Sequence, residues 1–424
     1  MAELINSFYE AGVSRPPPRP SLAGDAAADA CVIGGGYAGL SCALELARRG
    51  KSVIVLEAAR AGWGASGRNG GQFIRGYSTD DLAGPAAQSG TDEKYLFDLS
   101  LAAIDLLRAR VREFKIDCDL RQGHILAAVH PRHRREIDET ASRLINRYDY
   151  PVRVWDAAET RENIASRRYC GALADDNSGH FHPLKYLLGL LRAAENAGAV
   201  LYENTAAISV SETGGGAEIH TVNGTVRCRA AVLAGNAYLD ISPPLRARVM
   251  PVGTYIAATA PLAGGGADNL IAARRAVCDM NFVLDYFRCS ADDRLLFGGR
   301  VSYSNREPRD LARLMRRRML AVFPQLSAAP LDYVWGGSVA ITINRFPDIG
   351  RRGRATYYAQ GFSGHGAALS GFAGKVLADA ICGESGTLDV FGRIKHANFI
   401  GGKVLRTPIL VLAMMYYRLR DLCG

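Results

Sequence analysis

The sequence predicts an α/β (α+β) protein with two domains, one built on a parallel sheet and the other on an antiparallel sheet. Residues 29–57 have the pattern strand, glycine-rich turn, helix, strand, which is the unit from which parallel sheets are assembled. Between residues 250 and 335 apolar side chains recur largely with a period of two, as in antiparallel strands. A chain of 424 residues is long enough for two or three such domains.

The first unit carries a nucleotide-binding fingerprint typical of a Rossmann-like domain. Residues 31–33 predict a buried strand, and three glycines follow at the spacing Gly34-x-Gly36-x-x-Gly39. A second apolar run over residues 53–56 ends at Glu57, whose carboxylate is placed to accept hydrogen bonds from a ribose. The alternative is an ordinary glycine-rich turn that binds nothing. The residues expected to contact the nucleotide here are Gly34, Gly36, Tyr37, Ala38, Gly39, Glu57 and Ala58.

Composition and charge favour a globular enzyme over a nucleic-acid-binding or membrane-spanning protein. The chain is 48% apolar and 22% charged, and its formal charge of +9 comes from arginines spread along the chain, so no nucleic-acid partner is expected. Nine cysteines without a CxxC pair, and no signal peptide or long apolar span, predict a cytoplasmic protein. No metal site is expected, because His124, His180 and His182 lack ligand spacing beyond one HxH.

The remaining elements follow from periodicity and turn signals. Helices are expected over residues 92–116, 131–147, 182–198, near 307–323 and over about 366–381. Strands are expected over residues 199–203, 218–222, 225–228, 230–234, 253–259, 281–289, 294–299 and 355–359. Asn223-Gly224 predicts a type I′ hairpin turn.

The two sheet types predict a discontinuous domain organisation. Residues 1–27, which include the proline-rich stretch 14–20, are expected to form an N-terminal arm. The nucleotide-binding domain is expected to comprise residues 28–92, 160–246 and 344–424, and the substrate domain residues 93–159 and 247–343.

Three features favour FAD over NAD as the dinucleotide. A second glycine-rich loop follows Glu57 and could surround the pyrophosphate and flavin oxygens with backbone N–H groups. The strand over residues 230–234 ends at Gly235, which offers a further backbone approach. A third loop precedes the helix at about residue 366, so the positive end of that helix suits the negative charge of a reduced flavin. The additional expected cofactor contacts are Ser66, Gly67, Arg68, Asn69, Gly70, Gly71, Gln72, Ala207, Gly235, Gly361, Phe362, Ser363, Gly364, His365 and Gly366.

The segments GGGYAGLSCALELARRG, GASGRNGGQ and QGFSGHGAALSGFAGK resemble the D-amino acid oxidase (DAO) superfamily of flavoenzymes. Longer stretches, including MPVGTYIAAT and WGGSVAITINRFPDIG, are similar to its branch of bacterial γ-glutamylputrescine oxidoreductases. The resemblance runs from about residue 6 to about residue 422. It implies hydride transfer from the carbon beside a neutral amine to FAD, and an imine that hydrolyses to an aldehyde.

The resemblance leaves the substrate and the electron acceptor open. A γ-glutamylated amine such as γ-glutamylputrescine, in polyamine breakdown, is the leading hypothesis. The alternatives are a D-amino acid or N-methyl amino acid (sarcosine- or glycine-type) oxidase or dehydrogenase, and a non-catalytic FAD-binding partner subunit. Oxygen or another acceptor could reoxidise the flavin.

Four residues are candidates for the catalytic site. His365 is expected beside the flavin, where it would influence the charge of the reduced cofactor. Tyr286 and Tyr255 are expected to form an aromatic wall for the substrate. Alternation along residues 281–289 places Tyr286 and Arg288 on one face of that strand. Arg75 follows the flavin loop at a position where sarcosine oxidase relatives carry an arginine, and it could pair with a substrate carboxylate.

The chain departs from the amino-acid oxidases at three places. Ala368 replaces a lysine that holds an α-carboxylate, which favours an acid group farther from the reacting carbon. Ile341 replaces the cysteine that attaches flavin, which predicts non-covalent FAD. The RLLFGG strand lacks the lysine used near oxygen. Finally, the apolar run 408–417 is expected to dock on the protein's own surface, with peripheral membrane or subunit contact as the alternatives.

Overall fold

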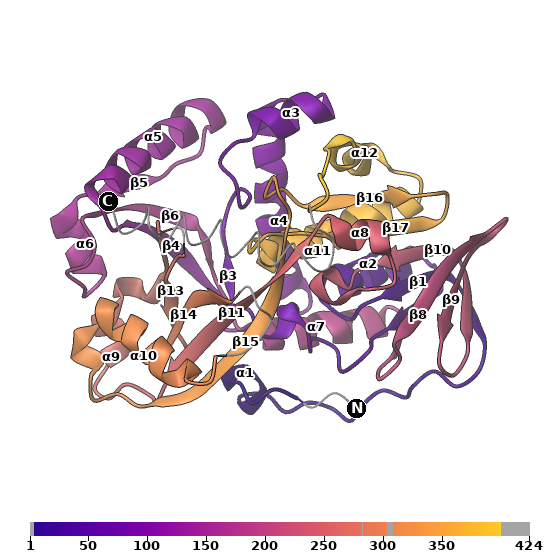
Figure 1. Ribbon diagram of the computed structural model, residues 1–424, viewed down its shortest axis with the longest axis horizontal. Coiled ribbons are helices and arrows are strands. Elements are labelled where there is room, and N and C mark those ends of the chain that lie inside the picture. Colours follow the sequence, from indigo (N-terminus) through magenta and orange to yellow (C-terminus); the bar gives the residue numbers. More distant parts are fainter. Residues whose placement is uncertain (1–3, 282, 303–307, 400–424) are drawn as a thin grey trace.

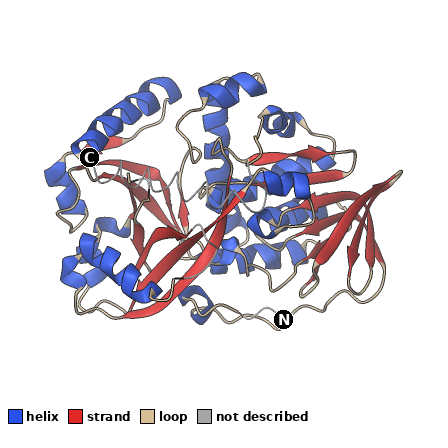
Figure 2. Ribbon diagram, viewed as in Figure 1, coloured by secondary structure: helices blue, strands red, loops and turns tan. Residues whose placement is uncertain are grey.

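The computed structural model describes residues 4–281, 283–302 and 308–399. Two large sheets lie in the two halves of the molecule, and helices pack around both of them (Figure 1, Figure 2). The predicted α/β (α+β) class, with a parallel and a largely antiparallel sheet, is confirmed. The run 408–417 lies outside the described residues.

The first sheet, sheet A, has the strand order β16-β17-β10-β1-β2-β7. Strand β1 lies between β10 and β2 and runs parallel to both, and β10 runs parallel to β17. The strands are β1 (Ala26–Ile33), β2 (Val53–Leu56), β7 (Val200–Tyr202), β10 (Thr225–Leu233), β16 (Asp348–Arg352) and β17 (Thr356–Gln360). An antiparallel pair, β8 (Ala207–Thr213) and β9 (Gly216–Thr221), extends from β10.

Four helices of this half pack closely against each other, and two of them also contact strands of sheet A. They are α2 (Tyr37–Arg48), α4 (Glu93–Glu113), α7 (Pro183–Asn196) and α11 (Gly366–Ile381). A Cβ added to Gly374 of α11 would clash with the Ala38 carbonyl oxygen of α2, so only glycine permits this approach. The α4 side chain of Arg110 is buried and donates to Glu45 of α2 at 2.8 Å.

The second sheet, sheet B, has the order β15-β11-β14-β13-β12-β4-β6-β3, with β5 paired to β6. All its neighbouring strands are antiparallel except β12 and β4. The strands are β3 (Gln72–Phe73), β4 (Arg121–Ala128), β5 (Arg153–Trp155), β6 (Gly171–His180), β11 (Met250–Thr259), β12 (Ala276–Asp279), β13 (Tyr286–Cys289), β14 (Leu295–Ser302) and β15 (Leu331–Ile341). The remaining helices are α1 (Phe8–Ala11), α3 (Ala83–Ser89), α5 (Pro131–Tyr148), α6 (Ala157–Asn163), α8 (Pro243–Ala247), α9 (Gly266–Leu270), α10 (Leu311–Val322) and α12 (Gly386–Arg393).

Sheet B has two buried faces, and they belong to different cores. One face packs against the core that also contains α2, α7 and α11. A row of residues paired across the strands lies on this face: Leu126, Cys278, Tyr286, Gly298, Ile256 and Trp335. The other face packs with α10: Ile125, Val277, Phe287, Phe297 and Ala257. Only the first face can therefore meet a ligand bound to sheet A.

Three strand predictions require correction. The strand expected over residues 281–289 is only Tyr286–Cys289, because the buried carboxylate of Asp279 accepts the N–H groups of Asn281 at 3.1 Å and Asp285 at 3.0 Å. These bonds keep residues 280, 281 and 283–285 out of the strand. The strands expected over 225–228 and 230–234 form one continuous strand, β10.

The prediction of a type I′ turn at Asn223-Gly224 is wrong as well. Neither Asn223 nor Gly224 has a positive φ, and the Thr221 N–H donates to the Gly224 carbonyl at 2.9 Å across a longer loop. Gly224 packs so closely on Gly24 of the N-terminal arm that a Cβ would clash with the Gly24 carbonyl oxygen. Tertiary packing against the arm therefore selects this glycine.

Sheet membership also differs from the expected segments at two places. Strands β3 and β6 lie within the predicted nucleotide-binding segments 28–92 and 160–246, but both pair in sheet B. Sheet A nevertheless draws its strands from three separated parts of the chain. The N-terminal arm runs from α1, below the junction of the two halves, to the start of β1 (Figure 1). Within the described ranges, no helix has the length and apolar character to span a membrane.

Candidate active site

The glycine fingerprint forms a tight turn between β1 and α2. Gly34 has a φ of +115°, and a Cβ there would lie 2.9 Å from the Ala234 carbonyl oxygen at the end of β10. A Cβ on Gly39 would clash with the carbonyl oxygen of Gly34. Helix α2 begins after Gly36, which has no side chain to cap it, and of its first N–H groups that of Tyr37 donates to the Ser66 hydroxyl. The positive end of the helix suits a pyrophosphate, which accepts hydrogen bonds and carries negative charge.

Glu57 lies partly buried beside this turn. Its carboxylate accepts the N–H of Gly35 at 2.7 Å and the N–H of Ala59 at 2.9 Å. Burial raises the pKa of Glu57 above its ordinary value, and the backbone hydrogen bonds oppose that rise. The Thr205 N–H donates to the Glu57 carbonyl at 2.8 Å, which brings the start of β8 at Ala207 toward the same place. The acid at the end of β2 thus fits a ribose next to the phosphate turn.

The loop of residues 66–72, called here the flavin loop, is held by one of its own side chains and by side chains of sheet B. The Asn69 amide donates to the Ala65 carbonyl at 3.0 Å and accepts the Gly71 N–H at 2.8 Å. From sheet B, Trp335 donates to the Arg68 carbonyl at 3.0 Å and Arg288 to the Gly70 carbonyl at 2.8 Å. The Ser66 hydroxyl accepts the Tyr37 N–H at 3.1 Å, so this loop and the fingerprint turn lie side by side.

The third expected loop, residues 361–366, lies beside Gly235 and Asn236, which follow the end of β10. The Gly361 N–H donates to the side chain of Asn236, the residue after Gly235, at 3.0 Å. Gly364 has a φ of +95°, is exposed, and has open space where a Cβ would point. His365 precedes the first turn of α11, which no side chain caps. Because β1, β10 and β17 are parallel neighbours, the residues after each strand (Gly34, Ala234-Gly235, Gly361) share one edge of sheet A.

A buried polar cluster lies beyond the flavin loop, around Asp175 of β6. The Asp175 carboxylate accepts hydrogen bonds from the Tyr150 hydroxyl and the Ser178 hydroxyl, both at 2.6 Å, and from Arg75 at 3.1 Å. Burial opposes ionisation of Asp175, but the charge of Arg75 and these donors outweigh it, so its pKa lies below the ordinary value. The carboxylate therefore fixes the orientation of Arg75.

Two neutral histidines face this cluster. Burial lowers the pKa of His124 to about 3, with the charges of Arg75 and His365 lowering it further and Asp175 opposing. Burial likewise lowers the pKa of His365 to about 4, and Arg75 lowers it further. His124 lies opposite Asp175 in the β4–β6 register, and neither of its ring nitrogens has a hydrogen-bond partner in the described part of the chain. It is a buried imidazole able to bind a ligand.

The two tyrosines expected to form one wall lie on opposite faces of sheet B. Tyr286 packs between Gly70 of the flavin loop and Gly298, where added Cβ atoms would meet its ring. Tyr255 is buried in the core of the second domain, over Gly336, together with Phe287. The structure therefore brings Tyr286, Arg75 and His365 toward the expected flavin and does not bring Tyr255 there.

The sequence-based interpretation missed Asp175, Tyr150 and His124. A period of two along residues 124–128 was a usable signal, because it places His124 on the same face as Leu126 and Ala128, which pack toward the first domain. No comparable signal marks Asp175 or Tyr150.

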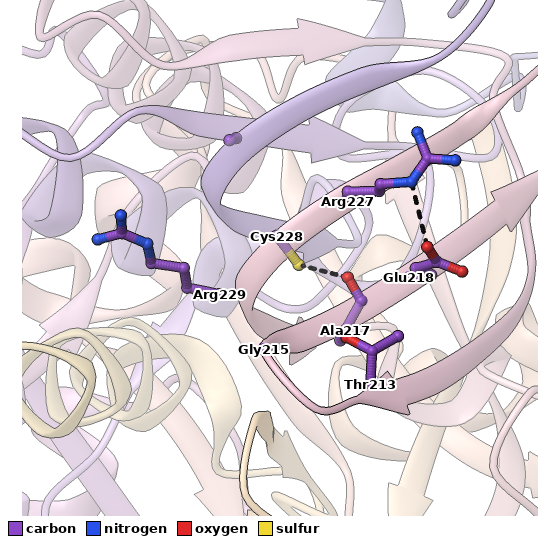
Figure 3. Close-up of a pocket in the computed structure, with 8 residues that line it drawn as sticks. Thr213, Gly215, Ala217, Glu218, Arg227, Cys228 and Arg229 are labelled. Atoms are coloured by element: carbon purple, nitrogen blue, oxygen red, sulfur yellow. Dashed lines mark hydrogen bonds and ion pairs between the residues drawn. The ribbon is translucent and has the colours of Figure 1, made fainter.

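A shallow pocket elsewhere contributes nothing to this site. It lies on the β8–β10 region, where Arg227 donates to Glu218 at 3.1 Å and Cys228 lies against the Ala217 carbonyl (Figure 3). None of the residues that line it belongs to the three loops or the polar cluster.

The sequence model of the family described as FAD dependent oxidoreductase (DAO) matches residues 29–380, which include all three loops. The chain belongs to this family. It is an enzyme that uses FAD, whose isoalloxazine ring accepts a hydride when it is bound. The glycine turn, the partly buried Glu57 and the open space over Gly364 fit that cofactor.

Full-length relatives support the same assignment. The chain is 37% identical over 426 residues to γ-glutamylputrescine oxidoreductase of Escherichia coli, with all of both chains covered. It is 38% identical to the probable oxidoreductase OrdL of Haemophilus influenzae, covering 99% of this chain and 98% of the relative. Among solved structures, glycine oxidase of Geobacillus kaustophilus matches with a TM-score of 0.74 at 22% identity, covering 88% of this chain and 100% of the other. That likeness shows the fold.

Proposed function

We propose that this FAD-dependent oxidoreductase oxidises an amine that carries a γ-glutamyl group, with γ-glutamylputrescine as the first candidate. The carbon beside the amine nitrogen would lose a hydride, and the resulting imine would hydrolyse to an aldehyde. The observation that carries the proposal is the full-length similarity to the γ-glutamylputrescine oxidoreductase of E. coli, at 37% identity without an uncovered segment.

The polar cluster supports this substrate class. Arg75 makes one hydrogen bond to Asp175, which orients its guanidinium, and it could pair with the carboxylate of the γ-glutamyl group. His124 and His365 are neutral at physiological pH, so they would not repel a substrate ammonium and could accept or donate a hydrogen bond. Tyr286 would close the apolar side of the site. Oxidation of this kind relies on orienting the reacting C–H bond and excluding water.

The mode of FAD binding and the electron acceptor belong to the same proposal. Ile341 ends β15 and offers no nucleophile, which supports FAD held without a covalent link. Acid precipitation should release all of the flavin into the supernatant, and flavin retained on the protein would contradict this part. Oxygen and other acceptors both stay open, and re-admission of air to the reduced enzyme distinguishes them.

The central experiment is anaerobic flavin reduction followed by absorbance. We expect γ-glutamylputrescine to bleach the flavin band, and putrescine, sarcosine, glycine and D-alanine to do so much more slowly. Purified protein without flavin absorbance would refute the assignment of the cofactor. Flavin that no amine reduces until a second chain is added would instead indicate a non-catalytic FAD-binding subunit.

Variants of two arginines test the substrate contact. Arg75→Lys keeps a cation beside Asp175 but loses the forked guanidinium, and we expect KM for γ-glutamylputrescine to rise about tenfold with a smaller change in kcat. Arg153→Gln is the matched control, because this exposed arginine binds the neighbouring Asp176. An unchanged KM in Arg75→Lys would remove Arg75 from the substrate site.

The runner-up is an oxidase or dehydrogenase of D- or N-methyl amino acids. The observation in its favour is Arg75, because a guanidinium fits an α-carboxylate as well as a γ-glutamyl carboxylate. Reduction of the flavin by sarcosine or D-alanine, and not by γ-glutamylputrescine, would favour this alternative.

A further inference from the structure

We propose that Tyr9, on the N-terminal arm, is a positioning residue for the flavin. It would act through the flavin loop, because it contacts both side chains of sheet B that hold carbonyl groups of that loop. The arm lies outside the segment 29–380 that the family model matches.

The contacts of Tyr9 are specific. Its side chain is fully buried, and its hydroxyl accepts a hydrogen bond from Arg288 Nη2 at 3.1 Å. The same guanidinium donates through Nε to the Gly70 carbonyl at 2.8 Å. The Tyr9 ring also packs against the Trp335 ring, with centroids 5.2 Å apart and planes at 70°. Both donors from sheet B to the flavin loop thus contact one tyrosine.

Fixing these two carbonyls fixes backbone N–H groups of the loop. Trp335 Nε1 holds the Arg68 carbonyl at 3.0 Å, and the peptide that joins residues 68 and 69 is planar. In a trans peptide the N–H points opposite to the carbonyl, so the Asn69 N–H points away from the Trp335 indole. The direction in which this donor points therefore depends on Trp335, and the place of Trp335 depends in part on Tyr9.

The arm is fastened along its length to the segments that surround Glu57. Arg15 donates to the Ala61 carbonyl at 2.8 Å, and the Arg19 N–H donates to Glu203 at 2.9 Å. The Leu22 N–H then donates to the Thr205 hydroxyl at 3.1 Å. The arm thereby joins the ribose end of the expected cofactor site to the flavin loop, as a strap across one side of the molecule (Figure 1).

A simpler account is that Tyr9 only fills space between the two halves of the protein. On that account, its hydroxyl would matter little for the cofactor, and its ring would matter only for overall stability. The hydrogen bond to Arg288 separates the two accounts, because it links Tyr9 to the loop and not to the core.

The test uses the FAD-loaded full chain and the variants Tyr9→Phe and Tyr9→Leu. Tyr9→Phe keeps the ring and leaves a buried donor of Arg288 without its acceptor, and we expect FAD to dissociate about tenfold faster, as followed by flavin fluorescence. Tyr9→Leu also removes the contact with Trp335 and should release FAD faster still. Both variants should shift the visible absorption band of the bound flavin, which a purely structural role would leave unchanged.

Tyr169→Phe is the matched control. Tyr169 is 3% exposed in the core of the second domain, and its hydroxyl has no hydrogen-bond partner among the residues that the structure describes. This variant should leave FAD release and the flavin spectrum as in the wild type. Wild-type dissociation rates and spectra in Tyr9→Phe would overturn the proposal, as would equally fast release from Tyr169→Phe. If Tyr9→Leu does not fold, Tyr9→Phe alone decides.

Discussion

The buried carboxyl of Asp279 should make the stability of the protein depend on pH near neutrality. Asp279 is 2% exposed and ends β12, just before the loop that leads to Tyr286. Burial, together with the nearby negative charge of Asp285, raises its pKa from 3.8 to about 7. Between these two values the folded protein keeps a proton that the unfolded chain has lost. The free energy of unfolding therefore falls as pH rises through this window.

The magnitude follows from the pKa difference. Each pKa unit corresponds to about 1.4 kcal/mol, so raising the pH from 5.5 to 8 should lower the free energy of unfolding by roughly 2 kcal/mol through Asp279. This decrease should be complete near pH 7, the pKa of the folded-state carboxyl. Buried histidines act in the opposite direction, because His180 and His182 have pKa values lowered to about 3 by burial and are neutral when folded. Their contribution rises with pH up to about 6.5. Only a comparison between variants isolates the effect of Asp279.

The perturbation is Asp279→Asn, which removes the titrating group and keeps an oxygen to accept the N–H groups of Asn281 and Asp285. We expect the difference in unfolding free energy, variant minus wild type, to grow by roughly 2 kcal/mol between pH 5.5 and 8. In thermal melts this corresponds to about 2 °C for a chain of this length. Asp98→Asn is the control, because that carboxylate is exposed and binds Lys94 at 2.9 Å. Parallel pH profiles of Asp279→Asn and the wild type would refute the reasoning.

Three further predictions concern other ionisable groups that are wholly or partly buried. Glu57→Gln should weaken FAD binding by about tenfold or more in a fluorescence titration of the apoprotein, since charge-assisted bonds are lost; unchanged affinity would exclude a ribose contact. Asp175→Asn leaves Arg75 without its buried partner and should lower the unfolding free energy by roughly 3–5 kcal/mol in urea; a loss below 1 kcal/mol would show that the pair is not buried in solution. Acidification from pH 7 to 4.5 should lower the free energy of unfolding by roughly 5 kcal/mol through His180 and His182. The double variant with phenylalanine at both positions should lack this part of the loss. An equal loss in the variant and the wild type would contradict the prediction.

The cofactor half of the site was largely predictable, because its signals are local. Glycines, an apolar run and a terminal acid lie within 29 residues, from 29 to 57, and parallel strands bring their ends to one edge in any such sheet. The flavin loop and the loop before α11 could be recognised for the same reason. Family membership and the use of FAD are confirmed by the match to the family.

The substrate half was less predictable, because pairing between distant strands creates it. His124 meets Asp175 only through the β4–β6 register, in which a bulge between Gln122 and His124 shifts the pairing. Alternation along β11 shows that Tyr255 and Ile256 face opposite sides, but it does not show which side meets the first domain. The loop before Tyr286 depends on bonds from the Asp279 carboxylate, which a strand pattern does not reveal.

The pairing of β1 with β10 has a consequence for how the protein is made. Ala30 lies beside Ala230 in the register, and β10 is flanked in turn by β17, beginning at Thr356. During synthesis, the fingerprint turn emerges long before the strands that must lie next to it. Since closing such long loops precedes any gain from the contacts, we expect slow folding with an exposed β1–β2 edge on the nascent chain. Full affinity for FAD should therefore appear only after the last strand of sheet A has left the ribosome.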